Sequence, residues 1–168
     1  YSEGAAAGEA GGDAFVDDCA LESDIEMYFP DRYVPSDSER MLLYRELDSL
    51  KGDDELERFR ARMVDRFGPV PQVGEELMRV VPLRRLGKSL GCEKVMLKQG
   101  RMTLFFVSNP QSAYYRSKTF DRVLEYIATN PRRCNLREQN GKRSMVVTGV
   151  NTVEEGVGVL KAMAGPEA

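Results

Sequence analysis

The chain has 168 residues, of which 42% are hydrophobic and 30% are charged, a composition typical of a globular domain with a buried core. It contains no histidine, which excludes Ser-His-Asp and Cys-His catalysis within this chain. The three scattered cysteines, Cys19, Cys92 and Cys134, suit reduced thiols better than a disulfide framework. With no long apolar run and no secretory signal, we expect a soluble cytoplasmic protein that does not enter a membrane.

Charge is distributed unevenly along the chain. Residues 1–57 carry 17 acidic and 4 basic residues, a net charge of −13, whereas residues 58–168 carry 10 acidic and 20 basic residues, a net charge of +10. A solvated acidic tail beside a mixed surface would explain this pattern. The alternative is a basic face that binds an acidic partner or nucleic acid.

The N-terminal part of the chain is predicted to be a linker followed by helices. Residues 1–22 are rich in Ala, Gly and acidic residues, so we expect a flexible linker that buries too little to fold. Residues 24–30 alternate apolar and polar side chains, which predicts a short strand. Three predicted helices follow, over residues 36–52, 53–67 and 72–90.

Local signals define the ends of these helices. Ser36 and Glu39 have the spacing of a capping box, and Gly52 is expected to end the first helix. Asp53 can cap the second helix. Pro82 lies inside the third helix and predicts a kink there.

The C-terminal part alternates hairpins and helices. Gln99-Gly100 and Asn140-Gly141 each separate two apolar runs, which predicts two β-hairpins. The predicted order is a hairpin over 93–107, a helix over 111–131, a hairpin over 133–150 and a helix over 151–165. We therefore predict one α+β domain over residues 23–165, with a helical N-terminal part and a four-stranded antiparallel sheet packed with helices.

Three motifs that can indicate binding sites have simpler explanations. Gly87-Lys88-Ser89 resembles the end of a P-loop, but the first glycine of that loop is replaced by Pro82 and the tripeptide ends a helix, where the dipole repels phosphate. The acidic residues within 53–57 are typical of a helix N-terminus rather than a metal site. Tyr114 and Tyr115 could stack on bases, but one of them is expected to pack inward. We expect no cofactor and no metal.

Several motifs in the first half point to one family. They are Pro30, Tyr33-Val34-Pro35, Arg40, Tyr44, Glu55-Leu56-Glu57 and Asp65-Arg66-Phe67-Gly68. With the later stretch LGKSLGCEKV, they resemble the C-terminal module of bacterial transcription-repair coupling factors, the Mfd family, over about residues 23–163. Pro82 departs from the family's unbroken helix, and Arg62 replaces a commonly acidic residue.

The resemblance implies a non-catalytic regulatory domain of a bacterial cytoplasmic protein. The parent would be an ATP-driven DNA translocase that displaces stalled RNA polymerase and recruits the excision-repair protein UvrA. Its C-terminal module would pack on a UvrB-like N-terminal module and mask the UvrA-binding surface. The motor domains, with a P-loop of their own, would lie upstream, and the isolated domain is expected to be a monomer.

The resemblance also suggests where the partner binds. We expect contacts from Asp65 and Arg66, with Arg62 as a third candidate, because the match is strongest there and these charges lie beyond the apolar stripe. Phe67 and Gly68 are expected to shape the turn. The local alternative is that Asp65 pairs only with Arg62 or Arg66.

Two other functions stay open from the sequence. A nucleic-acid-binding module would use the basic second half, where four cations cluster around one predicted hairpin: Arg133, Arg137, Lys142 and Arg143. An enzyme with an unrecognised carboxylate or cysteine site is the third reading, which no motif supports.

Overall fold

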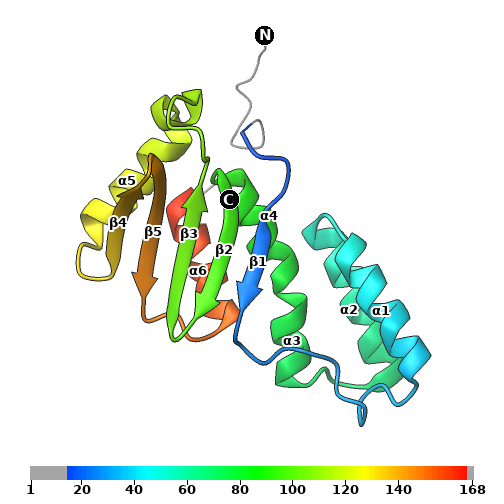
Figure 1. Cartoon of the computed structure of the whole chain (residues 1–168). Coiled ribbons are helices and arrows are strands. Elements are labelled where there is room, and N and C mark those ends of the chain that lie inside the picture. Colours follow the sequence, from blue (N-terminus) through cyan, green and yellow to red (C-terminus); the bar gives the residue numbers. More distant parts are fainter. Residues whose placement is uncertain (1–14, 166–168) are drawn as a thin grey trace.

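A five-stranded sheet forms the centre of the structure, a computed structural model that describes residues 15–165 (Figure 1). The strand order is β1-β2-β3-β5-β4, with β1 parallel to β2 and all other neighbours antiparallel. The strands are β1 Ala20–Ser23, β2 Cys92–Lys98, β3 Arg101–Phe106, β4 Cys134–Gln139 and β5 Lys142–Thr148.

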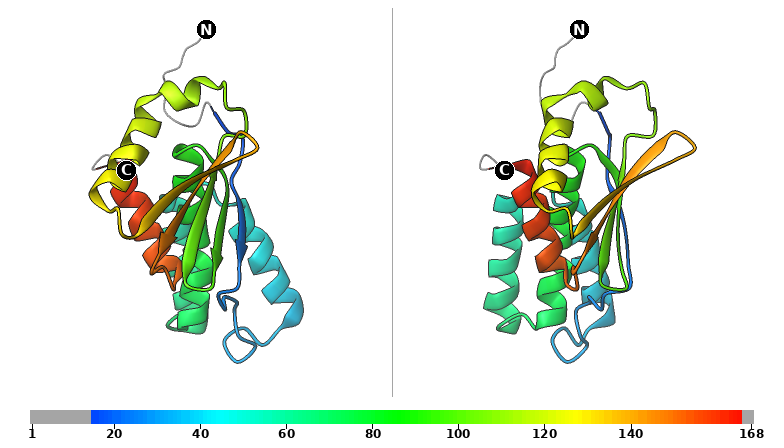
Figure 2. Two further views of the ribbon diagram at one scale, coloured as in Figure 1. Left: turned by 60° about the vertical axis from the view of Figure 1, so that its left-hand side comes forward. Right: turned by 90° about the vertical axis from the view of Figure 1, so that its left-hand side faces the viewer.

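The helices lie on one face of the sheet and beyond one of its edges. In Figures 1 and 2, α4, α5 and α6 cover one face, while α1 and α2 stand beside the β1 edge and α3 leads from them to α4. The helices are α1 Asp37–Ser49, α2 Asp53–Phe67, α3 Gln72–Met78, α4 Val80–Ser89, α5 Lys118–Thr129 and α6 Val153–Ala164, with a 3-10 turn, η2, at Ala113–Arg116. The α+β class is thereby confirmed.

Both predicted hairpins are present. Gln99 and Gly100 have φ angles of 56° and 72°, and Asn140 and Gly141 have φ angles of 55° and 77°. Two successive positive φ angles match the right-handed twist of the flanking strands, which is why Asn-Gly and Gln-Gly turns join them.

The four predicted antiparallel strands are present as β2-β3-β5-β4, but the predicted sheet was not complete, because β1 adds a parallel fifth strand. β1 also begins inside the segment predicted as a linker, residues 1–22, of which residues 1–14 fall outside the described residues. Val16 and Cys19 are buried in the main core, and Leu21 is in register with Val95 of β2. Residues 15–22 thus belong to the fold, although their acidic neighbours give the segment a polar composition.

Residues 24–30 are extended but do not pair as a strand, so that prediction was also wrong. Tyr28 donates its backbone N–H to the carbonyl of Val73, 3.1 Å away, and Phe29 is 1% exposed. Phe29 anchors a second apolar cluster, formed with α1, α2 and α3. The alternation in the sequence reflects the packing of Phe29 in this cluster and of Ile25 and Met27 against the main core, and not a sheet ladder.

The helix ends agree only partly with prediction. Ser36 caps α1 as expected, accepting the backbone N–H of Glu39 at 3.2 Å. However, α1 ends before Gly52, which is the N-cap of α2, and Asp53 lies in the first turn. The carboxylate of Glu55 accepts the N–H of Gly52 at 3.3 Å, so this glutamate does the capping that was expected of Asp53.

Two predicted helices are each divided. The helix predicted over 72–90 breaks at Arg79, three residues before Pro82, because proline has no N–H to donate to the carbonyl four residues earlier. The helix predicted over 111–131 is divided at Ser117, whose hydroxyl caps α5.

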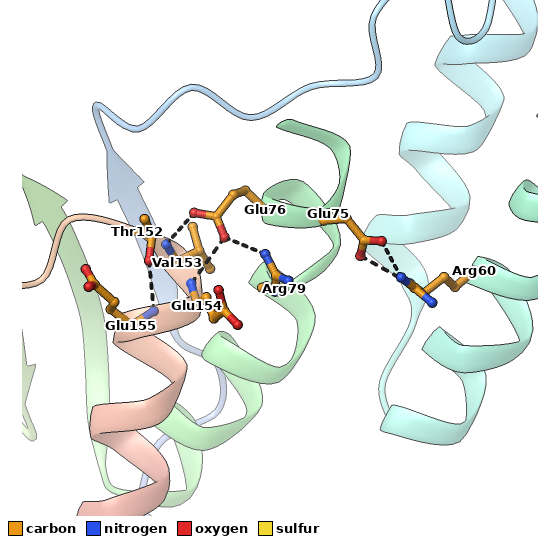
Figure 3. Close-up of polar contacts among 8 residues, drawn as sticks. All are labelled: Arg60, Glu75, Glu76, Arg79, Thr152, Val153, Glu154 and Glu155. Atoms are coloured by element: carbon orange, nitrogen blue, oxygen red, sulfur yellow. Dashed lines mark hydrogen bonds and ion pairs between the residues drawn. The ribbon is translucent and has the colours of Figure 1, made fainter. Parts of the chain in front are cut away.

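Two adjacent glutamates of α3, Glu75 and Glu76, connect α2 to α6 (Figure 3). Glu76 is only 3% exposed, and its carboxylate accepts the N–H groups of Val153 at 2.7 Å and Glu154 at 3.2 Å, at the N-terminus of α6. Arg79 donates to the same carboxylate at 2.9 Å. Three donors, two of them at the positive end of a helix, thus compensate its burial.

Glu75, the neighbouring residue, points the other way. It forms an ion pair with Arg60 of α2, with one hydrogen bond of 3.1 Å (Figure 3). Because consecutive residues of a helix face different directions, α3 can hold α2 on one side and α6 on the other.

Replacing Glu76 with Ala should lower the free energy of unfolding by about 2–4 kcal/mol, because two buried N–H groups and Arg79 lose their acceptor. Glu75→Ala, which removes a more exposed pair, should cost about 1 kcal/mol or less. Urea denaturation of both variants tests this, and equal losses would contradict the role assigned to Glu76.

Glu22 of β1 should make stability depend on acidic pH. Hydrogen bonds from Lys94 and then Lys98 of β2 lower the pKa of Glu22 from 4.5 to about 2. A lowered folded-state pKa stabilises the fold above about pH 4.5, and this contribution is lost as the pH falls towards 2. The difference in unfolding free energy between the native chain and Glu22→Gln should therefore shrink over that range. Glu125→Gln on α5 is the control, and a pH-independent difference would contradict the assignment.

Candidate functional site

The three predicted contact residues lie on the solvent side of α2. Arg62, Asp65 and Arg66 are exposed, whereas the opposite side of the helix enters the core through Leu56, Phe59 and Met63. This division follows from the apolar spacing of three and four residues along the helix. We call Arg62, Asp65 and Arg66 the α2 surface.

The two arginines of the α2 surface form ion pairs with α1. Arg62 pairs with Glu46 and Arg66 pairs with Glu39. The arginine side chains are still 63% and 66% exposed, so donor groups remain accessible to a partner. The pairs therefore orient the guanidinium groups more than they stabilise the fold, since exposed ion pairs contribute about 0–1 kcal/mol.

Aromatic rings beneath the arginines restrict them further. The guanidinium carbon of Arg62 lies 5.7 Å from the ring centroid of Phe59, and that of Arg66 lies 5.1 Å from the ring centroid of Phe67. Both distances are within the range of a cation–π contact. Each arginine is thus held by an acid on α1 and a ring on α2.

Asp65 differs from its neighbours. Its side chain is exposed, and within residues 15–165 it has no hydrogen bond or ion pair. Local pairing with Arg62 or Arg66 was the alternative considered from the sequence. Both arginines form their ion pairs with glutamates of α1 instead. The carboxylate of Asp65 is therefore available to a cation from outside the domain.

The sequence did not identify Glu39 and Glu46 as part of this surface. They are seven residues apart, two helical turns, and so lie on one face of α1. Arg62 and Arg66 are four residues apart on one face of α2. Two acids on one face of α1 and two bases on one face of α2 were the available signal, but they indicate a contact only once α1 and α2 are known to be adjacent.

Other motifs of the first half hold the extended segment against these helices. The hydroxyl of Tyr33 donates to the carbonyl of Gly68 at 2.7 Å, and Gly68 has a φ of 90°. Arg40 donates to the carbonyl of Val34 at 2.8 Å. Tyr33 and the α2 terminus thus contact each other, which gives the Tyr-Val-Pro and Asp-Arg-Phe-Gly motifs a shared structural role.

Gly87-Lys88-Ser89 occupies the last turn of α4, as predicted. A Cβ atom at Gly87 would lie 2.8 Å from the sulfur of Cys19, so the glycine allows the residue that precedes β1 to approach the helix closely. The hydroxyl of Ser89 donates to the carbonyl of Leu86 within the same helix. The tripeptide therefore has a packing role at a helix C-terminus.

Tyr114 and Tyr115 both hold parts of the fold together through their hydroxyl groups. Tyr114 is fully buried, donates its hydroxyl to the carbonyl of Leu90 and covers Gly91, where a Cβ atom would lie 2.2 Å from the ring. Tyr115 donates to the carbonyl of Val107. Burial is the main cause of the raised pKa of both tyrosines. Neither ring forms an open stacking platform.

The four cations predicted to cluster at the second hairpin do not form one patch. The guanidinium of Arg143 lies 4.3 Å from the ring centroid of Tyr115. Arg133 donates to the carbonyl of Thr148 at 3.1 Å. Arg137 and Lys142 are exposed, and the register places them on the face of the hairpin opposite to that of Arg143.

The titratable groups of the described residues include three cysteine thiols, all of them buried. Over residues 15–165, no group of three or more Asp, Glu or Cys side chains has the geometry of a metal site, and no helix is long and apolar enough to cross a membrane. Burial raises the pKa of Cys19 to about 12 and also raises the pKa of Cys92 and Cys134. Such thiols are poor nucleophiles.

Comparison with known proteins gives matches of sequence and of fold. The family model described as the TRCF domain matches residues 23–117. The transcription-repair-coupling factor of Rickettsia bellii (strain RML369-C) is 26% identical over 116 residues, covering 69% of this chain and 10% of that protein. The Escherichia coli (strain K12) transcription-repair-coupling factor is 32% identical over 66 residues, covering 39% and 6%. A crystal structure of the C-terminal domain of transcription-repair coupling factor matches with a TM-score of 0.71 and 17% identity, covering 88% of this chain and 89% of that one.

The shared fold and the motif-bearing helices define an α+β domain of the kind found at the C-terminus of transcription-repair coupling factors. Since the family model matches more than half of its residues, the chain belongs to the TRCF-domain family. This confirms the resemblance found in the sequence. The chain spans about a tenth of the length of most of the curated relatives that it matches.

Because Gly87 packs on Cys19 at a helix C-terminus, we predict no binding of nucleotide by this chain. Titration calorimetry with Mg-ATP should give no heat of binding. Saturable binding in the micromolar range that is lost in Lys88→Ala would contradict this prediction.

Proposed function

We propose that this chain is the non-catalytic C-terminal regulatory domain of a transcription-repair coupling factor and that it autoinhibits its parent. The parent is then an ATP-dependent DNA translocase that contacts RNA polymerase, DNA and UvrA in the bacterial cytoplasm. In this proposal the domain packs through the α2 surface on a UvrB-like module of the same chain. While it is packed there, it masks the surface that binds UvrA.

The observation that carries the proposal is the carboxylate of Asp65, which has no partner within residues 15–165 and lies on the same helix as two oriented arginines. Contacts within the domain explain the orientation of the two guanidinium groups but leave the neighbouring acid without a role in the fold. Fixed charges of both signs suit a partner with the complementary pattern, because charge complementarity sets specificity and register. The family membership supplies the context of a multidomain protein.

A charged and mostly polar surface also suits a reversible switch. Within one chain the effective concentration of a tethered partner is on the order of millimolar. An interface with a Kd of about 10 μM would then keep about 99% of molecules closed, with no need for a large apolar contact. An interface of this strength can open when another contact of the parent favours the open state by a few kcal/mol.

The test reverses the free charge in the full-length parent. Asp65→Lys should weaken the contact with the UvrB-like module and raise the affinity for UvrA about tenfold or more, because reversal places like charges in the interface. UvrA binding measured by surface plasmon resonance gives the readout. Thermal unfolding of the isolated domain should stay unchanged, since Asp65 has no partner within residues 15–165.

Glu125→Lys provides the matched control. Glu125 is also an exposed acid on a helix, but it lies on α5, away from the α2 surface. The control should leave UvrA affinity unchanged. If Asp65→Lys and Glu125→Lys raise UvrA affinity equally, or if neither does, the α2 surface is not the masking contact.

A further inference from the structure

Within residues 15–165, one face of the sheet has no helix on it. Figures 1 and 2 show α4, α5 and α6 on a single side, and the β4–β5 hairpin projecting beyond them. The side chains that face the helices are buried: Val95, Leu97, Met102, Leu104, Phe106, Met145 and Val147. Because side chains alternate along a strand, their neighbours in sequence face the other way. We call that side the open face.

The open face is strongly basic although the chain has a net charge of −3. The register of the five strands places five cations and one carboxylate on it, and Glu93, an exposed acid, lies in the β2 bulge between Cys92 and Lys94 without a register partner. The cations are Lys94, Lys98, Arg101, Arg137 and Lys142, and the carboxylate is Glu22. Five of the 20 basic residues of the second half of the sequence therefore lie on this one surface.

An aromatic ring lies in the middle of this basic surface. Phe105 of β3 is in register with Lys94 of β2 on one side and with Ser144 of β5 on the other, and Ser144 is in register with Arg137 of β4. The ammonium of Lys94 lies 5.7 Å from the centroid of the Phe105 ring. Phe105 is only partly buried, unlike Leu104 and Phe106 on the helix-covered side. A row across four strands thus reads cation, ring, hydroxyl, cation.

We propose that the open face binds single-stranded nucleic acid. The ring of Phe105 offers a surface on which an unpaired base can stack, and the flanking cations can contact phosphates on both sides of it. Hydroxyl and amide groups of Thr103, Ser144 and Asn135 lie on the same face and can bond to base edges. A duplex would satisfy the cations but could not use the ring, because its bases are already stacked. An acidic protein segment could also pair with the cations, but it has no base to stack on the ring of Phe105.

Glu22 limits how much of this charge is available. Its carboxylate forms ion pairs with both Lys94 and Lys98, at the β1 edge. Arg101, Arg137 and Lys142 have no ion pair within the described part of the chain. These three cations therefore lie on β3, β4 and β5. We expect the bound nucleic-acid strand to cross the sheet over these three β-strands, where its phosphates can contact the cations.

The test measures binding of the full chain to a fluorescent 12-nucleotide oligo-dT by anisotropy, between 50 and 200 mM salt. Arg101→Glu combined with Arg137→Glu should weaken binding about tenfold or more. Loss of two phosphate contacts should also reduce the slope of log K against log salt by about 1.4, at about 0.7 per contact. Phe105→Leu should weaken binding about fivefold or more while leaving the slope unchanged, because stacking releases no counterions.

Two further variants make the result specific to this face. Lys118→Glu combined with Lys161→Glu changes the same amount of charge on α5 and α6, and should change affinity less than about twofold. Glu22→Gln frees Lys94 and Lys98, so it should tighten binding and steepen the salt slope. Circular dichroism confirms folding of each variant, and the exposed pair Arg101 and Arg137 carries the test if Phe105→Leu does not fold.

The proposal is overturned by any of three outcomes. One is no binding of oligo-dT at 50 mM salt, and another is equal loss of binding in the control pair. The third is equal affinity for a 12-bp duplex or for a 12-residue poly-glutamate peptide, which would mean a general polyanion or acidic-protein surface. None of these measurements involves UvrA, so the result is independent of the function proposed for the α2 surface.

Discussion

The carboxylate of Glu76 determines how the two parts of this domain are joined. It supplies the acceptor that the N-terminus of α6 needs, and α6 in turn packs against the sheet. On the other side of α3, Glu75 holds α2 through Arg60. A buried charge is costly unless its hydrogen bonds are satisfied, so a shifted α3 would leave both the carboxylate and the helix end without partners. The position of the α1–α2 pair relative to the sheet therefore depends on these two glutamates of α3, together with the ion pairs that Arg84 and Arg85 of α4 form with Asp48 and Asp53.

Local sequence signals predicted most elements but not their connections. The Asn140-Gly141 turn, the Ser36 cap and the amphipathic pattern of α2 each depend on residues within a few positions of one another, and each is present. β1 was missed, because its short and polar sequence becomes a strand only by pairing with a segment more than 70 residues later. The contact between Glu76 and Val153 joins residues 77 positions apart and has no local signature.

The same limit applies to the candidate site. The exposure of Arg62, Asp65 and Arg66 could be predicted, because the apolar stripe of α2 fixes which residues face the solvent. Which of them are engaged within the domain could not be predicted, since that depends on the packing of α1 against α2. Because the arginines pair with Glu39 and Glu46, Asp65 is left without a partner within residues 15–165, whereas local pairing would have joined it to one of the arginines.

The α2 surface and the open face use charge in different ways. The α2 surface combines both signs at fixed positions, which favours one complementary partner and gives a net charge near zero. The open face carries mostly one sign, which favours a polyanion over a patterned protein surface. No residue belongs to both surfaces, and α1 and α2 stand beyond the β1 edge without covering the open face (Figure 1). Docking of α2 on another module would therefore leave the sheet residues in place, so the two proposed contacts are not mutually exclusive in the geometry of this domain.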